Sequence, residues 1–317
     1  MKHITVRGIN EEFQISRIAF GTGSVMKDLT KEEYFSLFDY YAEKGGNVLD
    51  TAPGYCGGRS ERYIGEWMKL HNNREQMFIS TKACHAFEGE PSRLTYKDMM
   101  DDLNQSLSQL DTDYVDILWI HNDDEAVPVE QIMDDLNRVL EKGCVRSIGC
   151  SNWTVSRLEK ANAYAASAGL HGFWANQIQW SLAAAETDAY ARAFNALTMD
   201  DRSYNWYVNN DIAVFAFSAT ARGFFSVAAQ GGIEAVSEQT MSYFGTPNNI
   251  KRLENVKKYM AEHNCSAAVP VIGYITNNRL KGVALTSASR MSTLEETMEA
   301  ANAEMTAEEA DALYCNI

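Results

Sequence analysis

Basic residues, long apolar runs and closely paired metal-binding residues are all scarce in this sequence of 317 residues. Lysine and arginine number 28 against 43 aspartates and glutamates, which gives a formal net charge of −15. Nucleic acids and anionic membrane surfaces both attract basic segments, so this balance argues against either as a main partner. Net charge describes the whole chain, however, and it does not exclude a small pocket that binds an anion through local donors.

The cysteines and histidines also lack the short spacings of a metal site. None of the six cysteines forms a Cys-x-x-Cys pair, and none of the six histidines stands four residues from another. We therefore expect no metal site and no disulfide framework. The N-terminal segment MKHITVRGINEEFQIS has no apolar centre of a secretory signal, and no apolar run approaches the roughly 18 residues of a membrane span. These absences predict a cytoplasmic protein in a reducing compartment. The cysteines are Cys56, Cys84, Cys144, Cys150, Cys265 and Cys315.

Short apolar runs recur along the chain, and each is followed by a longer segment with helical periodicity. Their starts are roughly 30 to 55 residues apart, a spacing that suits a strand, a helix and two loops. The runs predicted as strands are residues 17–23, 47–51, 77–82, 115–121, 145–151, 173–180, 212–217 and 267–274.

Signals for the starts of helices lie between these runs. Residues 30–44 begin with Thr30 and Glu33, which have the spacing of a capping box. The segment 60–70 begins at Ser60, a predicted N-cap. The further predicted helices are residues 96–110, 129–142, 154–168 and 248–263.

The repeated strand–helix pattern predicts an α/β fold, a closed parallel (β/α)8 TIM barrel that forms one domain over residues 1–317. The rival is an open doubly wound sheet, which normally carries the turn G-x-G-x-x-G after its first strand. The corresponding turn in this chain is GTGSVM, which lacks the third glycine. The sequence therefore favours the barrel.

Three segments fall outside the repeats. Residues 2–7 and 12–15 predict an N-terminal β-hairpin at the bottom of the barrel. Residues 183–207 form a long insertion after the sixth strand, which places them at the top rim. The acidic chain after residue 290 contains a predicted capping box at Ser292–Glu295 and is expected to form closing helices.

Four chemically compatible side chains stand at or just after the ends of three neighbouring predicted strands. They are Asp50, Tyr55, Lys82 and His121. Because functional residues of such barrels lie at the carboxyl ends of strands, we expect these side chains to meet on one rim. An ammonium lowers the pKa of a nearby phenol from its ordinary value of about 10, and an aspartate keeps that ammonium charged. The set fits general acid catalysis at a carbonyl, with Tyr55 as the proton donor and His121 orienting the oxygen.

Each of these residues taken alone has an ordinary structural role. An aspartate at a strand end often caps a helix, and a lysine there is usually solvated. A tyrosine in a glycine-rich loop usually packs, and a histidine usually forms a structural hydrogen bond. Because the four stand together at matching strand ends, the set favours a functional interpretation.

Longer stretches resemble the aldo-keto reductase family, in the family's order and over nearly the whole chain. They are NVLDTAPGYCGGRSERYIGEW, FISTK, YVDILWIHNDD, VRSIGCSNW, NQIQWS, AFSATARGFFS and VIGYITNNRL. The combination of D-T-A-x-x-Y, R-S-E, S-T-K and I-G-x-S-N is highly specific. The resemblance implies an NAD(P)H-dependent enzyme that reduces an aldehyde, a ketone or a sugar-derived carbonyl, and oxidises the alcohol in reverse. It makes Asp50, Tyr55, Lys82 and His121 the catalytic tetrad.

The resemblance also implies a cofactor site. Ser151, Asn152 and Gln177 match residues that bind the nicotinamide carboxamide. Phe217 matches an aromatic residue that stacks under the nicotinamide ring, and the loop 218–223 matches the segment that covers the pyrophosphate. The complete set of implied cofactor-binding residues is Gly21, Thr22, Asp50, Ser151, Asn152, Gln177, Phe217, Ser218, Ala219, Thr220, Arg222, Gly223, Gly273, Thr276 and Arg279.

The segment after the predicted eighth strand departs from the family pattern. Ile275 stands where the family often has a basic residue, and Gly282-Val283 replaces a common Glu-Asn pair. Arg279 and Thr276 remain as donors to a 2′-phosphate. We therefore expect NADP(H) to be favoured, with NAD(H) possible.

Several alternatives stay open at this stage. The same fold with an intact tetrad also suits a nucleotide-binding regulatory subunit with little turnover, as in the potassium-channel β subunits. An isomerase or aldolase that forms a Schiff base on Lys82 needs a neutral lysine, which Asp50 opposes. The sequence identifies neither the substrate nor the oligomeric state. The aromatic residues that form either a substrate wall or structural packing are Trp180, Tyr190, Phe194, Trp206 and Tyr207.

Overall fold

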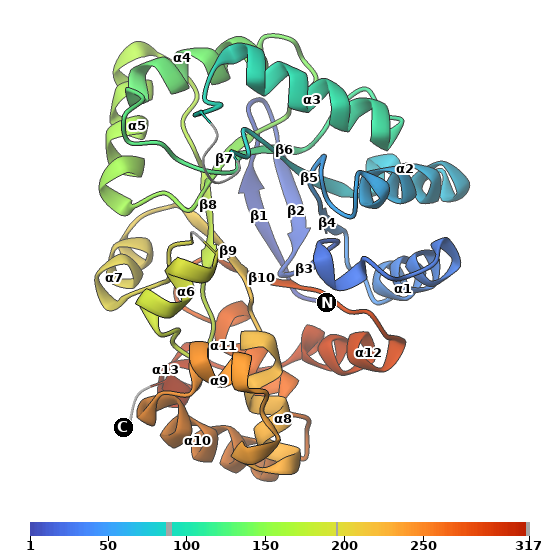
Figure 1. The fold of residues 1–317 in the computed structure, drawn as a ribbon, viewed down its shortest axis with the longest axis vertical. Coiled ribbons are helices and arrows are strands. Elements are labelled where there is room, and N and C mark those ends of the chain that lie inside the picture. Colours follow the sequence, from blue (N-terminus) through green and yellow to red (C-terminus); the bar gives the residue numbers. More distant parts are fainter. Residues whose placement is uncertain (87–90, 195, 315–317) are drawn as a thin grey trace.

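The computed structural model describes residues 1–86, 91–194 and 196–314 (Figure 1). Eight parallel strands close into a barrel in the order β10-β3-β4-β5-β6-β7-β8-β9. Nearly all of their residues are buried, as expected for parallel strands with side chains inside the barrel and helices outside it. The predicted (β/α)8 fold is confirmed. The strands are β3 (Ile18–Gly21), β4 (Val48–Asp50), β5 (Phe78–Ala83), β6 (Ile117–Ile120), β7 (Ile148–Ser151), β8 (Ala175–Gln179), β9 (Ala213–Phe217) and β10 (Gly282–Thr286).

Helices surround the barrel (Figure 1). The capping box at the start of α1 is confirmed, because the Thr30 hydroxyl accepts from the Glu33 N–H and the Glu33 carboxylate accepts from the Thr30 N–H. The helices are α1 (Lys31–Glu43), α2 (Arg59–His71), α3 (Tyr96–Leu110), α4 (Val129–Leu140), α5 (Val155–Ala168), α6 (Thr187–Phe194), α7 (Asp201–Asn209), α8 (Phe224–Gly231), α9 (Glu238–Phe244), α10 (Pro247–His263), α11 (Ala268–Thr276), α12 (Met291–Glu299) and α13 (Ala307–Tyr314).

Two predicted helix starts are wrong. The N-cap of α2 is Gly58, which adopts a left-handed conformation, and Ser60 lies inside the helix, where its hydroxyl donates to the Thr22 carbonyl. The N-cap of α12 is Arg290, and no side-chain capping bond forms there. The predicted capping box at Ser292–Glu295 therefore lies within the helix.

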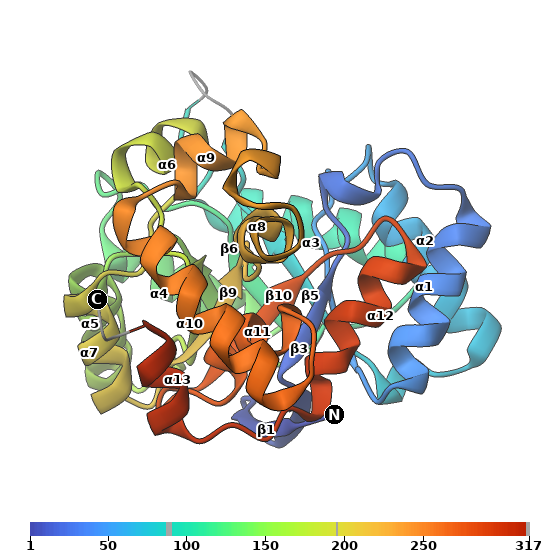
Figure 2. The same ribbon diagram turned by 90° about the horizontal axis from the view of Figure 1, so that it is seen from below.

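The N-terminal hairpin pairs β1 (His3–Arg7) with β2 (Glu12–Ser16) in antiparallel register. Its Val6 and Ile15 are buried against residues at the amino ends of the barrel strands. Figure 2 shows β1 at the lower end of the barrel and α6 and α9 at the upper end. The hairpin therefore covers the bottom of the barrel, as predicted, and leaves the carboxyl ends of the strands on the opposite face.

The predicted eighth strand is wrong, because residues 268–276 form α11. A proline in a central strand removes a ladder hydrogen bond, whereas Pro270 stands in the first turn of α11, where its missing N–H has no partner to lose. The strand that closes the barrel is β10, which pairs with β9 on one side and β3 on the other. Gly282 permits a close approach, since a Cβ there would lie 2.5 Å from the Ile275 carbonyl oxygen.

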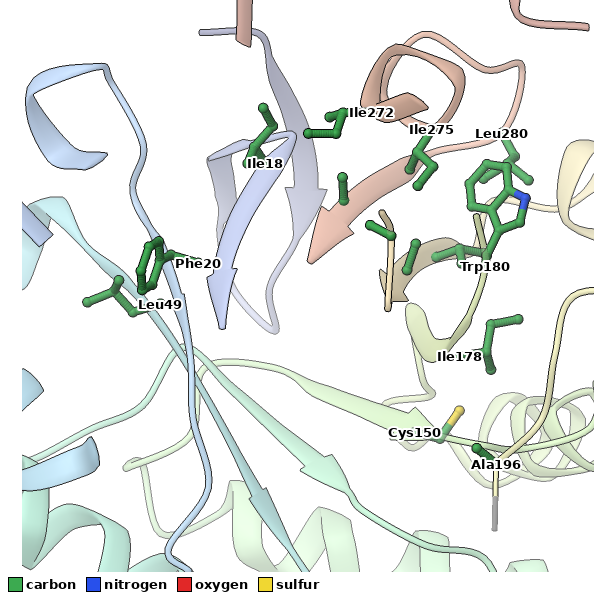
Figure 3. Close-up of a cluster of buried hydrophobic side chains, with 14 of the residues drawn as sticks. Ile18, Phe20, Leu49, Cys150, Ile178, Trp180, Ala196, Ile272, Ile275 and Leu280 are labelled. Carbon is green, nitrogen blue, oxygen red and sulfur yellow. The ribbon is translucent and has the colours of Figure 1, made fainter. Parts of the chain in front are cut away.

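The insertion after β8 contains α6 and most of α7, with Asn195 outside the described residues. Figure 3 shows Trp180 directed toward Ile275 and Leu280, in the layer between the strands and the outer helices. No helix in the described part of the chain is long and apolar enough to cross a membrane. Cys315 also lies outside the described residues. The cysteines that the structure describes are free thiols: Cys56, Cys84, Cys144, Cys150 and Cys265.

Candidate active site

The predicted catalytic side chains come from adjacent strands of the barrel. Asp50 ends β4, Lys82 lies near the end of β5, and His121 directly follows β6. Because β4 pairs with β5 and β5 with β6, these residues reach the same rim. Tyr55 lies in the turn that follows β4, next to them.

Lys82 and Asp50 form a buried ion pair. The Lys82 Nζ lies 2.6 Å from Asp50 Oδ2 and donates to the Thr51 carbonyl at 2.8 Å. Their side chains are only 1% and 2% exposed. Burial alone would lower the pKa of the Lys82 ammonium, but Asp50 and then Tyr55 raise it above its ordinary value. Lys82 therefore stays charged at neutral pH, which disfavours a Schiff-base mechanism.

Tyr55 lies against this ion pair. The Lys82 Nζ is 4.8 Å from the centroid of the Tyr55 ring, and the His121 ring centroid is 6.3 Å from it. Burial raises the pKa of Tyr55 above 10.0, and Lys82 opposes that rise without cancelling it. The expected lowering by Lys82 is thus present, but the predicted net direction is wrong because burial is the larger effect. Tyr55 therefore keeps its proton at neutral pH, and Lys82 is the neighbouring group that favours loss of that proton.

His121 lies beside the Tyr55 ring in this cluster. Burial lowers the pKa of His121 well below 6.5, and the charge of Lys82 and the neighbouring His85 lower it further. The neutral imidazole keeps one N–H that can donate to a carbonyl oxygen.

The depressed pKa of His121 makes a testable prediction about pH. Since His121 is neutral at pH 6 as well as at pH 8, the rate of carbonyl turnover should not titrate with a midpoint near the ordinary histidine value of 6.5. A kcat profile between about pH 5.5 and pH 7.5, roughly one unit on either side of that value, tests this expectation. A protonation step centred near 6.5 that disappears in His121→Gln would contradict it.

His85 is a further residue of this site that was not predicted from the sequence. Its ring centroid lies 4.6 Å from that of His121, and its Nδ1 lies 2.9 Å from Asn122 Oδ1. The available signal was its position just after β5, three residues beyond Lys82. His85 therefore adds a polar side chain to the site on the side of β5 and β6.

The implied nicotinamide residues form one hydrogen-bonded chain that ends on Asp50. Gln177 Nε2 donates to Asp50 Oδ1 at 3.0 Å, Ser151 Oγ donates to the Gln177 carbonyl at 3.0 Å, and Asn152 Nδ2 donates to Ser151 Oγ at 3.2 Å. On the other side, Thr22 donates to the Asp50 carbonyl through its N–H and its hydroxyl. The structure therefore brings these predicted residues together. Asn152 does not cap α5, whose N-cap is Thr154.

The loop after β9 has an unusual backbone. Ser218, Ala221 and Arg222 have φ values of 51°, 49° and 55°, in the left-handed region where side chains other than glycine cost roughly 1–2 kcal/mol each. Gly223 follows at φ 79°, and α8 then begins without a side-chain cap. The Ala221 and Gly223 N–H groups donate within the loop, to the Ser218 and Thr220 carbonyls. The left-handed backbone beside a helix N-terminus without a side-chain cap is an arrangement that favours anions. Phe217, at the end of β9, is half-buried beside this loop.

The loop after β10 lies next to the first strand. Ser287 Oγ donates to the Gly21 carbonyl at 2.8 Å, and Ser289 and Arg290 are exposed beyond it. Barrels of this type frequently bind phosphate between the loops after their seventh and eighth strands, which are β9 and β10 in this chain. Ser287, Ser289 and Arg290 are not among the predicted site residues, because the eighth strand was predicted at residues that form α11.

The structure does not bring Gly273, Thr276 and Arg279 to this rim. They lie in or just after α11, before β10 begins, and Arg17 at the start of β3 donates to the Leu280 and Gly282 carbonyls. This segment therefore lies at the amino end of the barrel, on the side of the hairpin. Arg279 is held there by Asp311 and Glu308, 2.9 Å and 3.1 Å away. Gly273, Thr276 and Arg279 were expected at the upper rim because the eighth strand was predicted at residues 267–274, whereas in this part of the chain only the residues after β10 reach that rim.

Aromatic residues near the insertion make structural contacts. Trp206 Nε1 donates to Glu159, and the Tyr207 hydroxyl accepts from Asn176 Nδ2. Trp180 packs against Tyr274, with ring centroids 5.4 Å apart. These contacts support the packing interpretation of Trp180, Trp206 and Tyr207 and a structural role for Asn176.

Comparisons with known proteins agree with this geometry. The sequence model of the aldo/keto reductase family matches residues 17–314. The chain is 36% identical over 164 residues to norsolorinic acid reductase B of Dothistroma septosporum, a match that covers 49% of this chain and 42% of that protein. It is 34% identical over 168 residues to an aryl-alcohol dehydrogenase [NADP(+)] of Phanerodontia chrysosporium, covering 50% of this chain and 44% of that protein. The match thus spans a little under half the length of these relatives.

A solved structure shares the whole fold. A crystal structure of a thermostable aldo-keto reductase with the inhibitor epalrestat has a TM-score of 0.74 to this chain at 22% identity, and the match covers 99% of both chains. This likeness supports the barrel architecture.

Proposed function

Because the chain belongs to the aldo/keto reductase family, we propose that it reduces the carbonyl of an aldehyde, ketone or sugar-derived substrate and oxidises the alcohol in reverse. The observation that carries the proposal is the buried Lys82–Asp50 pair against Tyr55, on the same rim as a neutral His121. A protonated phenol beside a fixed ammonium is an acid whose conjugate base is stabilised where it forms.

The residues on the rim also fit a nicotinamide dinucleotide. A hydrogen-bonded chain of amide and hydroxyl groups leads from Asn152 through Ser151 and Gln177 to Asp50, and these groups can offer a carboxamide both donors and acceptors. The left-handed loop after β9 and the uncapped start of α8 offer backbone N–H groups for a pyrophosphate. A bound reduced nicotinamide supplies the hydride for the carbonyl carbon.

In this proposal the side chains of the protein transfer the proton to the substrate oxygen. His121 donates a hydrogen bond to the substrate oxygen and fixes its position. Tyr55 gives its hydroxyl proton to that oxygen as the alcohol forms. Lys82 stabilises the phenolate that remains, and Asp50 holds Lys82 in place through their 2.6 Å contact. Solvent then returns the proton to Tyr55.

We propose NADPH as the preferred cofactor, with Arg290 and Ser289 as donors to its 2′-phosphate in place of Arg279 and Thr276. Both residues are exposed directly after the barrel-closing strand, at the rim. One of the relatives also carries NADP(+) in its name. An arginine fork binds a phosphate through two parallel N–H bonds, which a 2′-hydroxyl cannot match.

Two arginine variants test this assignment as a matched pair. Arg290→Ala is expected to raise the KM for NADPH roughly 10-fold and the KM for NADH by less than about 2-fold, since only the phosphate contact is lost. Arg279→Ala removes the same charge from the opposite end of the barrel and should leave both values near wild type. Steady-state kinetics with each cofactor measures them. A selective NADPH defect in Arg279→Ala, with Arg290→Ala normal, would reverse the assignment.

The first substrates to test are aromatic aldehydes and ketones, because one relative is named for aryl alcohols. Aliphatic aldehydes and keto-sugars complete the panel. Loss of reduced-nicotinamide absorbance with any member supports the proposed function. Cofactor binding without turnover on the whole panel would favour a nucleotide-binding regulatory subunit.

A further inference from the structure

Two helices outside the barrel hold the loop that follows β9. The hydroxyl of Tyr190, on α6, lies 2.7 Å from Ser218 Oγ at the start of the loop. Near its end, Arg222 Nη2 donates to Gln239 Oε1 on α9 at 3.1 Å. The loop is therefore tethered from outside at both of its ends.

The two helices act as one support. The Tyr190 ring lies 4.6 Å from Phe194, 5.6 Å from Tyr243 and 5.8 Å from Phe244, centroid to centroid. We call these four residues the aromatic clamp. The Glu186 N–H also donates to the Tyr243 carbonyl at 2.7 Å, which joins the start of α6 to α9. Figure 2 shows α6 and α9 side by side at the upper end of the barrel.

Tyr190 is the member of the clamp that reaches the loop. It is only 2% exposed, so packing fixes its ring and its hydroxyl has little freedom to turn away from Ser218. Ser218 is also the first residue of this loop with a positive φ, a conformation that persists only where the surroundings hold it. The bond from Tyr190 therefore acts on the residue at which the loop leaves β9.

We propose that Tyr190 is a positioning residue that holds Ser218, and with it the loop 218–223, in the shape that receives the cofactor pyrophosphate. This inference rests on the proposed function, because it assigns the loop to the cofactor. A loop fixed before binding loses less conformational entropy when the cofactor arrives. Loss of the bond therefore weakens cofactor binding and speeds cofactor release, while the tetrad stays in place.

Tyr190→Phe tests the inference, because it removes one hydroxyl and keeps the ring in the aromatic clamp. The dissociation constant for NADPH and its release rate are expected to rise roughly 3- to 10-fold, the range of one lost hydrogen bond. Stopped-flow fluorescence of the full-length chain measures both. Ser218→Ala should give the same change, and the double variant no more than either single variant. Tyr243→Phe removes a hydroxyl from the same clamp without touching the loop, and it should bind NADPH as the wild type does.

The outcomes separate this inference from the proposed function. If the wild-type protein binds neither NADPH nor NADH, the proposed function fails. If it binds cofactor and both Tyr190→Phe and Ser218→Ala release it at the wild-type rate, Tyr190 does not position the loop, although the proposed function stands. If Tyr190→Phe lowers both the melting temperature and the affinity for NADPH, and Ser218→Ala leaves the affinity unchanged, the role of Tyr190 is structural only.

Discussion

Tyr55→Phe is expected to lower kcat for carbonyl reduction by roughly 10²- to 10⁴-fold, the usual contribution of a positioned general acid. Phenylalanine keeps the ring against Lys82 and removes only the proton that the substrate oxygen must receive. The dissociation constant for the cofactor should stay within about 2-fold of the wild-type value, because the implied nicotinamide contacts come from β7 and β8.

Steady-state reduction kinetics beside a cofactor titration measures both effects of this substitution. A large loss of kcat with normal cofactor binding identifies Tyr55 as the acid. A variant that turns over at a near-normal rate would show that the proton comes from another group. An equal loss of cofactor affinity would show that the Tyr55 hydroxyl acts in cofactor binding, because the ring is still present in this variant.

Breaking the buried ion pair should reduce stability as well as activity. Lys82→Met leaves the Asp50 carboxylate buried with hydrogen bonds from Ser80 and Gln177 but no positive charge beside it. Losing one partner of such a pair costs roughly 3–5 kcal/mol of unfolding free energy. Turnover is also expected to fall, because nothing then stabilises the Tyr55 phenolate.

The double variant Asp50→Asn/Lys82→Met separates these two effects. With both charges gone, most of the lost stability should return, since no buried charge is left unpaired. Activity should not return. Urea unfolding and kcat measurements on the two single variants and the double variant complete the comparison. Lys97→Met, which breaks the exposed pair with Asp101, is the control and should unfold as the wild type does. If Lys82→Met has the unfolding free energy of the wild type, the Lys82–Asp50 pair does not stabilise the fold, which would contradict this prediction.

Much of the barrel could be predicted because its strands are short, buried and regularly spaced. The apolar run at residues 267–274 was predicted as a strand although residues 268–274 lie in α11, and the reason is physical. All residues of α11, from Ala268 to Thr276, are buried, so the helix has no polar face and shows no helical periodicity. Pro270 was the signal against a central strand. That one error moved the expected phosphate donors from the upper rim to the lower end of the barrel.

The four proposed catalytic residues could be predicted for a different reason. Asp50, Lys82 and His121 stand at or directly after strand ends, which barrel geometry brings together, and the short turn after β4 keeps Tyr55 beside them. The sequence could not show the balance of effects on the pKa of Tyr55, which depends on how deeply the ring is buried beside Lys82. Nor could it show the contact between Tyr190 and Ser218, since 28 residues separate them along the chain and no pattern connects them.

In the proposed reaction, a hydride reaches the carbonyl carbon at this rim while Tyr55 protonates the oxygen. The most direct test is single turnover with NADPH that carries deuterium on the transferred position of the nicotinamide, followed by mass spectrometry of the product. With an aldehyde from the substrate panel, the wild-type protein should give an alcohol with one deuterium on the former carbonyl carbon, and Tyr55→Phe should give almost none in the same time. A wild-type protein that binds the cofactor and yields no deuterated alcohol from any member of the panel would contradict the proposed reaction.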